Sequence, residues 1–420
     1  MDILRLNGKK FIRVLLFTVV CFSGLIGIIA TNGPIYPDDP AAAPLQGTKI
    51  YDAPTGLKAQ QPSLAWNGSN FGVFYVLPWT NGSAADLNFM RVDTSGALQS
   101  GPRRIITIPS SFWGYRSIVS NLVWNPDDQQ FAFAYAYGKY LWFKRLTAVG
   151  GELAYVKIEF PGLPDHEHPH LIHVSLVYNT FNKEYALTFV TREDPYDESR
   201  HDDIYITRIK ADGTFVGPYA RFHAVDCPED CYYTSLAYSK KTGKYLVSYM
   251  KNMPAPSMSH TNVTFIDSNF NVSEHRVFPA FQFMGGWHVQ THYDPRSGDF
   301  LVLSDNPSRD LISQTIKEDG TLGSMLTRTK ITGSNGYWDK TLADVTATAH
   351  NYLISTSARV NNSTQIYGWH ASETQHDSTN LIYPPNTSTE RYDPYLTRVG
   401  SSLYQTWIDD GDVYFGKIGN

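Results

Sequence analysis

Residues 121–125 read NLVWN, and close variants of this five-residue motif recur along the 420-residue chain. Measured from Trp124 and its equivalents, consecutive copies are 51 to 60 residues apart. The copies are SLAWN (63–67), NLVWN (121–125), SLVYN (175–179), SLAYS (235–239), QTHYD (290–294) and two weaker ones, DVTAT (344–348) and PYLTR (394–398). A repeat of this length, built from short strands, is typical of the blades of a β-propeller.

Two further strand-like runs and a hairpin turn follow each motif. In the first unit these are FGVFYV (71–76), LNFMRVD (87–93) and the turn DTSGAL (93–98). β-branched and aromatic residues suit a half-buried sheet, and the turn glycine suits positive φ. The seventh unit ends after its third strand, so GTKIYDAP (47–54) can supply the fourth. The sequence therefore predicts an all-β fold, a single seven-bladed β-propeller of four-stranded antiparallel blades over 47–420.

The stretch QPSLAWNGSNFGVFYVLPW (61–79), with LNFMRVDTSGAL (87–98), resembles the sialidase-like (BNR-like) repeats of extracellular β-propeller proteins. The resemblance extends over nearly all of the chain beyond its N-terminal segment, but at the level of the fold. The Asp-box of true sialidases, S-x-D-x-G-x-T-W, is absent, and so is the WD40 signature. The resemblance therefore implies an extracellular propeller and assigns no catalytic residue.

The N-terminus has the pattern of a targeting segment. Four basic residues lie within the first 13, and an apolar run extends from Val14 to Ala30. Residues 1–30 are therefore a signal peptide cleaved after Ala30, or an uncleaved signal anchor. Residues 31–46 form a Pro-rich linker. In both cases we expect the propeller outside the cytosol, secreted or anchored at the surface, touching a membrane only through this segment.

Export agrees with two further features. Cys227 and Cys231, in CPEDC, favour a disulfide in an oxidising compartment. The predicted N-glycosylation sites are Asn67, Asn81, Asn262, Asn271, Asn361, Asn362 and Asn386. The net charge of −5 gives no basic surface for nucleic acid, and we expect a monomer.

Aromatic and charged residues gather in the predicted blade-to-blade loops. Antiparallel alternation places these loops, and the loops between second and third strands, at one end of every blade. Rings stack on the C–H faces of sugars, while amides and charges bind hydroxyls, so a lectin-like or adhesive carbohydrate-binding rim is predicted. Its residues are Trp113, Tyr115, Trp287, Tyr337, Trp338, Asp339, Lys340, Tyr392 and Asp393. The competing interpretation is that these rings wedge neighbouring blades together.

Two other functions fit the same end of the propeller. A polysaccharide lyase acting on uronates needs a carboxylate neutraliser with an acid and a base, which Arg116, His170, Tyr233, His288 and Arg391 could supply. A glycoside hydrolase would need two carboxylates, for which Asp339 with Asp393 or Glu390 is the available pairing. The remaining alternative is a scaffold for protein partners.

The stretch DHEHPHLIH (165–173) is rich in potential metal ligands. His166, His168 and His170 could bind a divalent metal, although their spacing fits no established site. The alternatives are a solvated loop and an acid–base role for His168 or His170. His170 and His173 begin an inner strand, and we expect them to face the channel.

Overall fold

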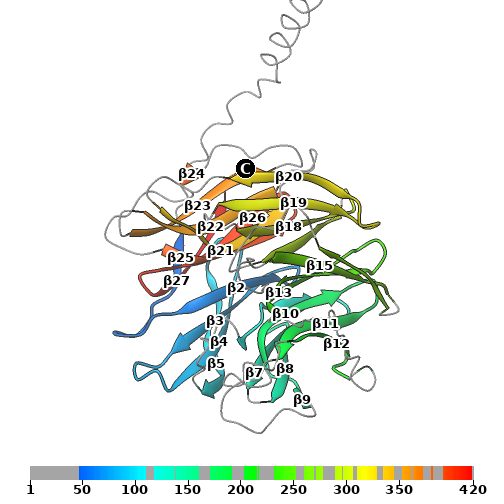
Figure 1. Cartoon of the computed structure of the whole chain (residues 1–420). Helices are drawn as coiled ribbons and strands as arrows, with labels where there is room; N and C mark the ends of the chain where they lie inside the picture. Colours follow the sequence, from blue (N-terminus) through cyan, green and yellow to red (C-terminus); the bar gives the residue numbers. More distant parts are fainter. Residues whose placement is uncertain are drawn as a thin grey trace, which may run out of the picture. The chain divides into compact units, whose positions relative to one another are not determined.

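The computed structural model shows antiparallel sheets throughout the unit Pro44–Asn420 (Figure 1). It describes residues 47–109, 118–137, 139–159, 171–191, 203–214, 216, 231–251, 260–268, 271–277, 289–295, 297–305, 310–328, 334–344, 352–360, 363–371, 380–381 and 391–418. No helix within these ranges is both long and apolar enough to cross a membrane. The predicted signal segment and linker, 1–46, lie outside them.

The described strands form antiparallel sheets in which chain order and sheet order coincide, except that β1 joins the last sheet beside β27. The first two four-stranded sheets are β2 (Gln60–Trp66), β3 (Phe71–Pro78), β4 (Ala84–Val92) and β5 (Leu98–Pro109), then β6 (Val123–Asn125), β7 (Gln130–Tyr137), β8 (Tyr140–Thr147) and β9 (Val156–Glu159). The next two are β13 (Cys231–Tyr238), β14 (Tyr245–Lys251), β15 (His260–Ile266) and β16 (Val272–Val277), then β17 (Gln290–Asp294), β18 (Asp299–Asp305), β19 (Leu311–Lys317) and β20 (Leu322–Arg328). The last two are β21 (Ser334–Asp344), β22 (Tyr352–Val360), β23 (Ser363–Ala371) and β24 (Asn380–Leu381), then β25 (Arg391–Val399), β26 (Ser402–Asp409) and β27 (Asp412–Ile418) with β1 (Thr48–Tyr51).

The protein is thus an all-β propeller with antiparallel four-stranded blades. The prediction of seven such blades is confirmed for six units. The third predicted unit has three strands within the described residues: β10 (Leu171–Asn179), β11 (Glu184–Thr191) and β12 (Asp203–Lys210). First strands of neighbouring sheets pack on one another, β10 on β13, β13 on β17 and β2 on β25, so they are the inner strands.

The N-terminal strand completes the last blade, as predicted. Thr48 pairs with Phe415 and Lys49 with Tyr414 in an antiparallel ladder. The Lys49 ammonium lies 2.8 Å from the Asp412 carboxylate. A Cβ at Gly47 would lie 1.9 Å from the Trp407 ring, so this close approach requires glycine. The pairing covers an edge strand that would otherwise be open to other chains.

In four of the motifs the aromatic residue packs on a ring at the start of the next strand. Trp124 meets Phe131 with ring centroids 4.7 Å apart, and Tyr178 meets Tyr185 at 4.8 Å. Trp66 and Tyr293 make the equivalent contacts in their own blades. Contacts of this kind bury large rings between blades and stabilise the sheet stack.

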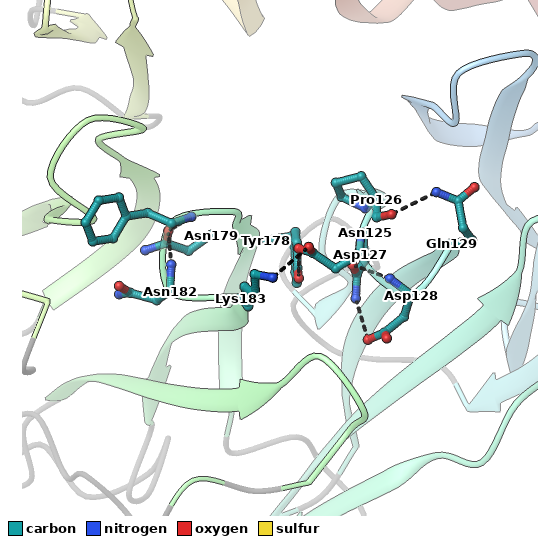
Figure 2. A network of polar contacts seen from close by, with 10 residues as sticks. Asn125, Pro126, Asp127, Asp128, Gln129, Tyr178, Asn179, Asn182 and Lys183 are labelled. Carbon is teal, nitrogen blue, oxygen red and sulfur yellow. Dashed lines mark hydrogen bonds and ion pairs between the residues drawn. The ribbon is translucent and has the colours of Figure 1, made fainter.

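The last residue of the motif caps the turn that follows. The Asn179 Oδ1 atom accepts the backbone N–H groups of Phe181 and Asn182 (2.9 and 3.1 Å), and Asn125 Oδ1 accepts those of Asp127 and Asp128 (2.9 and 3.1 Å). Figure 2 shows both turns side by side, bridged by Tyr178 Oη donating to Asp127 Oδ2 at 2.6 Å. We call this end of the inner strands, formed by the turns 67–70, 125–130, 179–184 and 239–244, the base.

The register predicted for the sixth copy is wrong. DVTAT was aligned through Ala347, but β21 ends at Asp344, which pairs with Tyr352 as Tyr178 pairs with Tyr185. Asp344 therefore occupies the position that an aromatic residue fills in the stronger copies. With no ring to mark that position, the sequence pattern is ambiguous by a few residues.

Candidate functional site

The inner strands share an unusual backbone conformation at the end opposite the base. Gln61, His173, Tyr233 and Asp393 have φ values of 49°, 55°, 51° and 55°. Each lies in a shift of the ladder between the inner strand and its neighbour, two residues before Ser63, Ser175, Ser235 and Tyr395 respectively. These are β-bulges with a left-handed residue, a conformation that is costly for non-glycine residues. We call these four residues the mouth positions.

Just inside the mouth positions, a belt of hydrogen bonds links successive blades. Ser63 Oγ accepts the Leu122 N–H at 3.1 Å, and Asn121 Oδ1 accepts that of Leu176 at 3.4 Å. The same bond recurs from Leu236 N to Ser175 Oγ (3.3 Å) and from Thr291 N to Ser235 Oγ (2.9 Å). The first letter of these four motifs therefore holds the next blade in place, which helps to fix the spacing of the mouth positions.

The inner strands enclose a cavity of about 320 Å³, here called the inner cavity. Most of the side chains that could contact a ligand there are polar, and the rings of His173 and Tyr233 lie with centroids 4.2 Å apart. The polar and aromatic lining residues are Asn121, His173, Ser175, Tyr233, Thr234, Ser235, Gln290, Thr291, His292 and Tyr395. Burial raises the pKa of the Tyr395 phenol, with a hydrogen bond from Asn121 acting in the opposite direction, so Tyr395 is neutral and can donate a hydrogen bond.

A smaller side cavity of about 170 Å³ shares Val119, Asn121 and Tyr395 with the inner cavity and extends to Gln61 and Asp393. The Gln61 N–H donates to Asp393 Oδ2 at 3.0 Å. The Gln61 Oε1 atom is buried and accepts no hydrogen bond from any residue that the structure describes. A buried acceptor that lacks a partner costs about 1–3 kcal/mol, so this atom is suited to a donor brought by a ligand.

The charge of the two cavities is low. Among the described residues that line them, Asp393 is the single carboxylate, and there is no lysine or arginine. Arg391 belongs to the same strand as Asp393 but lines neither cavity, and its Nε atom is 2.9 Å from Asp409 Oδ2. The described wall therefore offers no cation that would neutralise a ligand carboxylate.

The predicted site residues are distributed unevenly with respect to these cavities. Tyr233 and Asp393 line them, as does His173, whereas Tyr392 packs on the hydrophobic core. The backbone of β21 contains Tyr337, Trp338, Asp339 and Lys340, with a ladder shift between Trp338 and Thr341. The predicted residues outside the described ranges are Trp113, Tyr115, Arg116, His166, His168, His170, Trp287 and His288.

Sequence reasoning missed Gln61, Asn121 and Tyr395 as cavity residues. A usable signal exists, because every mouth position lies two residues before the first letter of its structurally aligned motif. By that rule Asp339 is the equivalent residue in β21, where the ladder shift falls between Trp338 and Thr341. As for a metal, the described part of the chain contains no cluster of three or more His, Cys, Asp or Glu residues able to hold one.

The residues predicted to form a disulfide or to carry glycans differ in their burial. Cys231 is buried and disulfide-bonded, while Cys227, its predicted partner, lies outside the described residues. Asn81 and Asn271 are exposed, and Asn67 is half-buried. Asn262 is 2% exposed within β15, so its interpretation as a surface sequon is wrong. Asn361, Asn362 and Asn386 are not described.

Solved structures with the same architecture span most of the chain. The Dos1 propeller has 12% identity and a TM-score of 0.50, with 89% of this chain and 95% of that chain covered. A chain of the mitotic checkpoint complex has 10% identity and a TM-score of 0.50, covering 93% and 98%. The subtype N11 neuraminidase-like protein of A/flat-faced bat/Peru/033/2010 (H18N11) has 11% identity and a TM-score of 0.44, covering 90% and 95%.

Neither a protein-family model nor a curated protein sequence matches the chain. At identities this low, the structural similarity establishes the β-propeller fold and leaves function open. The similarity to sialidase-like repeats therefore holds for the fold alone.

Proposed function

We propose that the protein is an exported, lectin-like β-propeller that binds carbohydrate in the inner cavity, with the side cavity as its extension. The observation that carries this proposal is the polar, ring-bearing wall around His173 and Tyr233. Hydroxyl, amide, imidazole and phenol groups pair with sugar hydroxyls, while rings contact sugar C–H faces. A volume of about 320 Å³ is at the small end of ligand pockets, which suits the end of a glycan chain.

The preferred sugar is neutral. A uronate carboxylate in either cavity would lack a lysine or arginine partner among the described lining residues and would meet the Asp393 carboxylate in the side cavity. Burial of an unpaired charge is costly, whereas hydroxyl donors fit the open Gln61 Oε1 acceptor. This argument favours neutral glycans over the uronates that a polysaccharide lyase would require.

The test is binding of the full chain to matched neutral and uronate oligosaccharides, measured by calorimetry. The His173→Asn variant removes the imidazole but keeps a residue that tolerates the left-handed backbone. We expect it to weaken binding of the neutral glycan by about tenfold, which corresponds to about 1.4 kcal/mol. Thr180→Ala, at the base, is the matched control and should bind normally.

Four results would contradict the proposal. Equal binding by the His173→Asn variant would remove the inner cavity from recognition. Tighter binding of uronates would show that groups outside the described wall set the charge preference. New reducing ends or unsaturated products would show that the protein is an enzyme and not a lectin. Absence of any glycan binding would favour the protein-scaffold alternative.

A further inference from the structure

We propose that Asn81 carries an N-linked glycan whose first sugar packs on the exposed indole of Trp79. The proposal rests on export of the chain, which is part of the proposed function, and is independent of the inner cavity. Trp79 is 41% exposed, and Asn81 is exposed two residues later in the sequence Trp-Thr-Asn-Gly-Ser. An exposed indole two residues before a sequon offers an apolar face that the first sugar can cover.

A tight turn holds the two residues together. The Gly82 N–H donates to Trp79 O at 2.9 Å, and the Trp79 N–H donates to Ala84 O at 2.8 Å. The first bond closes a β-turn over residues 79–82, whose first and fourth Cα atoms lie within about 7 Å of each other. Gly82 follows with a φ of 67°, which closes the hairpin between β3 and β4. Asn81, the third turn residue, therefore lies within a sugar's length of Trp79.

The side chain of Asn81 is presented for modification. Its Oδ1 atom accepts the Ser83 N–H at 3.0 Å and the Ser83 hydroxyl at 2.8 Å. Among the described residues, no hydrogen bond involves Asn81 Nδ2. In glycosylation this nitrogen bonds to C1 of the first N-acetylglucosamine of a lipid-pyrophosphate-linked oligosaccharide. The C1–O bond breaks, the lipid pyrophosphate leaves, and one amide proton is released.

The chain contains a matched sequon with the same tripeptide, Asn67-Gly68-Ser69. Here Asn67 Oδ1 caps the turn at the base, and Nδ2 donates to Ala148 O at 3.4 Å in the next blade. The neighbouring Trp66 is half-buried, and its ring packs on Phe71 with centroids 4.7 Å apart. A glycan at Asn67 would break an interblade bond beside a ring that is already packed, whereas one at Asn81 breaks none and covers exposed apolar surface.

The experiment expresses the full chain behind a cleavable secretion leader in a host that performs N-glycosylation. Peptide mass spectrometry then gives the occupancy of Asn81 and Asn67, and an endoglycosidase trims each glycan to one sugar. Because the leader ensures export and no ligand binding is measured, a failure here is distinct from failure of the carbohydrate proposal.

We expect Asn81 to be occupied more fully than Asn67. In the wild-type protein, one sugar at Asn81 should raise Tm by about 1–2 °C relative to Asn81→Gln. In the Trp79→Ala background, one sugar at Asn81 should give no Tm shift relative to Asn81→Gln. With Trp79 present, hydroxyl-radical footprinting should show Trp79 protected when Asn81 is glycosylated and reactive when it is not. An unoccupied Asn81, or an equal shift in both backgrounds, would overturn the proposal.

Discussion

The two ends of the inner strands use polar residues in opposite ways. At the base, Asn125 and Asn179 are fully buried, and each caps a turn through two hydrogen bonds. At the mouth positions, polar residues adopt left-handed backbone conformations and face cavities. The base therefore uses its buried polar groups to cap turns, and its left-handed residues, Gln129 and Lys183, lie within those turns. The left-handed residues of the mouth face cavities instead, where turn formation does not explain their strain.

The difference shows how one repeated motif can serve two purposes. Its last letter, Asn or Ser, caps the turn of its own blade, and at Asn67 and Asn179 it also bonds to the next blade. Its first letter bonds to the next blade and fixes the spacing around the cavity. The residue two positions before the motif then varies among Gln, His, Tyr and Asp. A fixed framework with variable residues at one end is the usual arrangement of a binding site on a rigid scaffold.

The largest expected effect is at the base. Asn179→Ala removes two turn-capping bonds and the bond from Asn179 Nδ2 to Gly243 O, which is 3.1 Å long and links two blades. Because these groups are buried, we expect a loss of about 3 kcal/mol in the free energy of unfolding, measured by urea titration.

The matched control is Asn67→Ala, which changes the same motif position where the side chain is half-buried. It should cost about 1 kcal/mol, since water can replace its bonds. Equal losses at the two positions would show that burial of the cap does not determine its contribution. Neither variant should change glycan affinity, and a change would mean that base and mouth are coupled.

The second prediction concerns alkaline pH. Burial raises the pKa of Tyr185, and burial together with Glu184 raises that of Tyr245, both near the base. Below pH 10 each phenol is protonated in both states, so the stabilisation is fully present. Above about pH 10 the unfolded chain loses the proton that the folded chain retains, and the free energy of unfolding falls by about 1.4 kcal/mol per pH unit for each such tyrosine.

Urea unfolding between pH 8 and 11 measures this slope. The Tyr185→Phe variant removes one titrating group and should reduce the slope by that amount, whatever its effect at neutral pH. A slope that Tyr185→Phe leaves unchanged would show that Tyr185 titrates alike in both states and does not contribute to alkaline sensitivity.

Much of the fold could be predicted because the motif repeats its own chemistry. Rings such as Trp124 and Tyr178 mark the end of each inner strand, and the following Asn marks a turn. The predicted positive φ of the hairpin glycines is confirmed, for example 85° at Gly96. The register predicted for 344–348 was wrong, because no aromatic residue marks the end of that inner strand.

The site was harder to predict for a physical reason. A left-handed residue in a bulge is imposed by packing between blades, and neither glutamine nor tyrosine favours that conformation locally. The sequence pattern favoured aromatic residues in loops as site residues. Gln61 and Tyr395 lie within strands, where sequence alone predicts a role in packing. The orphan Gln61 Oε1 atom is visible only once the side cavity and its neighbours are placed.

The prediction with the smallest effect on stability compares glycine substitutions at the mouth and at the base. Gln61 at the mouth and Gln129 at the base have nearly the same φ, 49° and 53°. Glycine relieves about 1–2 kcal/mol of left-handed strain but loses about 0.5–1 kcal/mol through the entropy of the unfolded chain. Gln61→Gly and Gln129→Gly should therefore each be neutral or stabilising by up to about 1.5 kcal/mol in urea titrations.

Glycan affinity should distinguish the two variants, Gln61→Gly and Gln129→Gly. Gln61→Gly keeps the backbone N–H that donates to Asp393 but removes the Oε1 acceptor from the side cavity, so glycan affinity should fall. Gln129→Gly loses an exposed bond from Nε2 to Pro126 O and should bind as the wild type does. If both variants bind equally well, the strained glutamine at the mouth has no role in recognition, and its conformation reflects blade packing alone. If Gln61→Gly alone weakens binding while gaining stability, the strain at the mouth is retained for ligand contact.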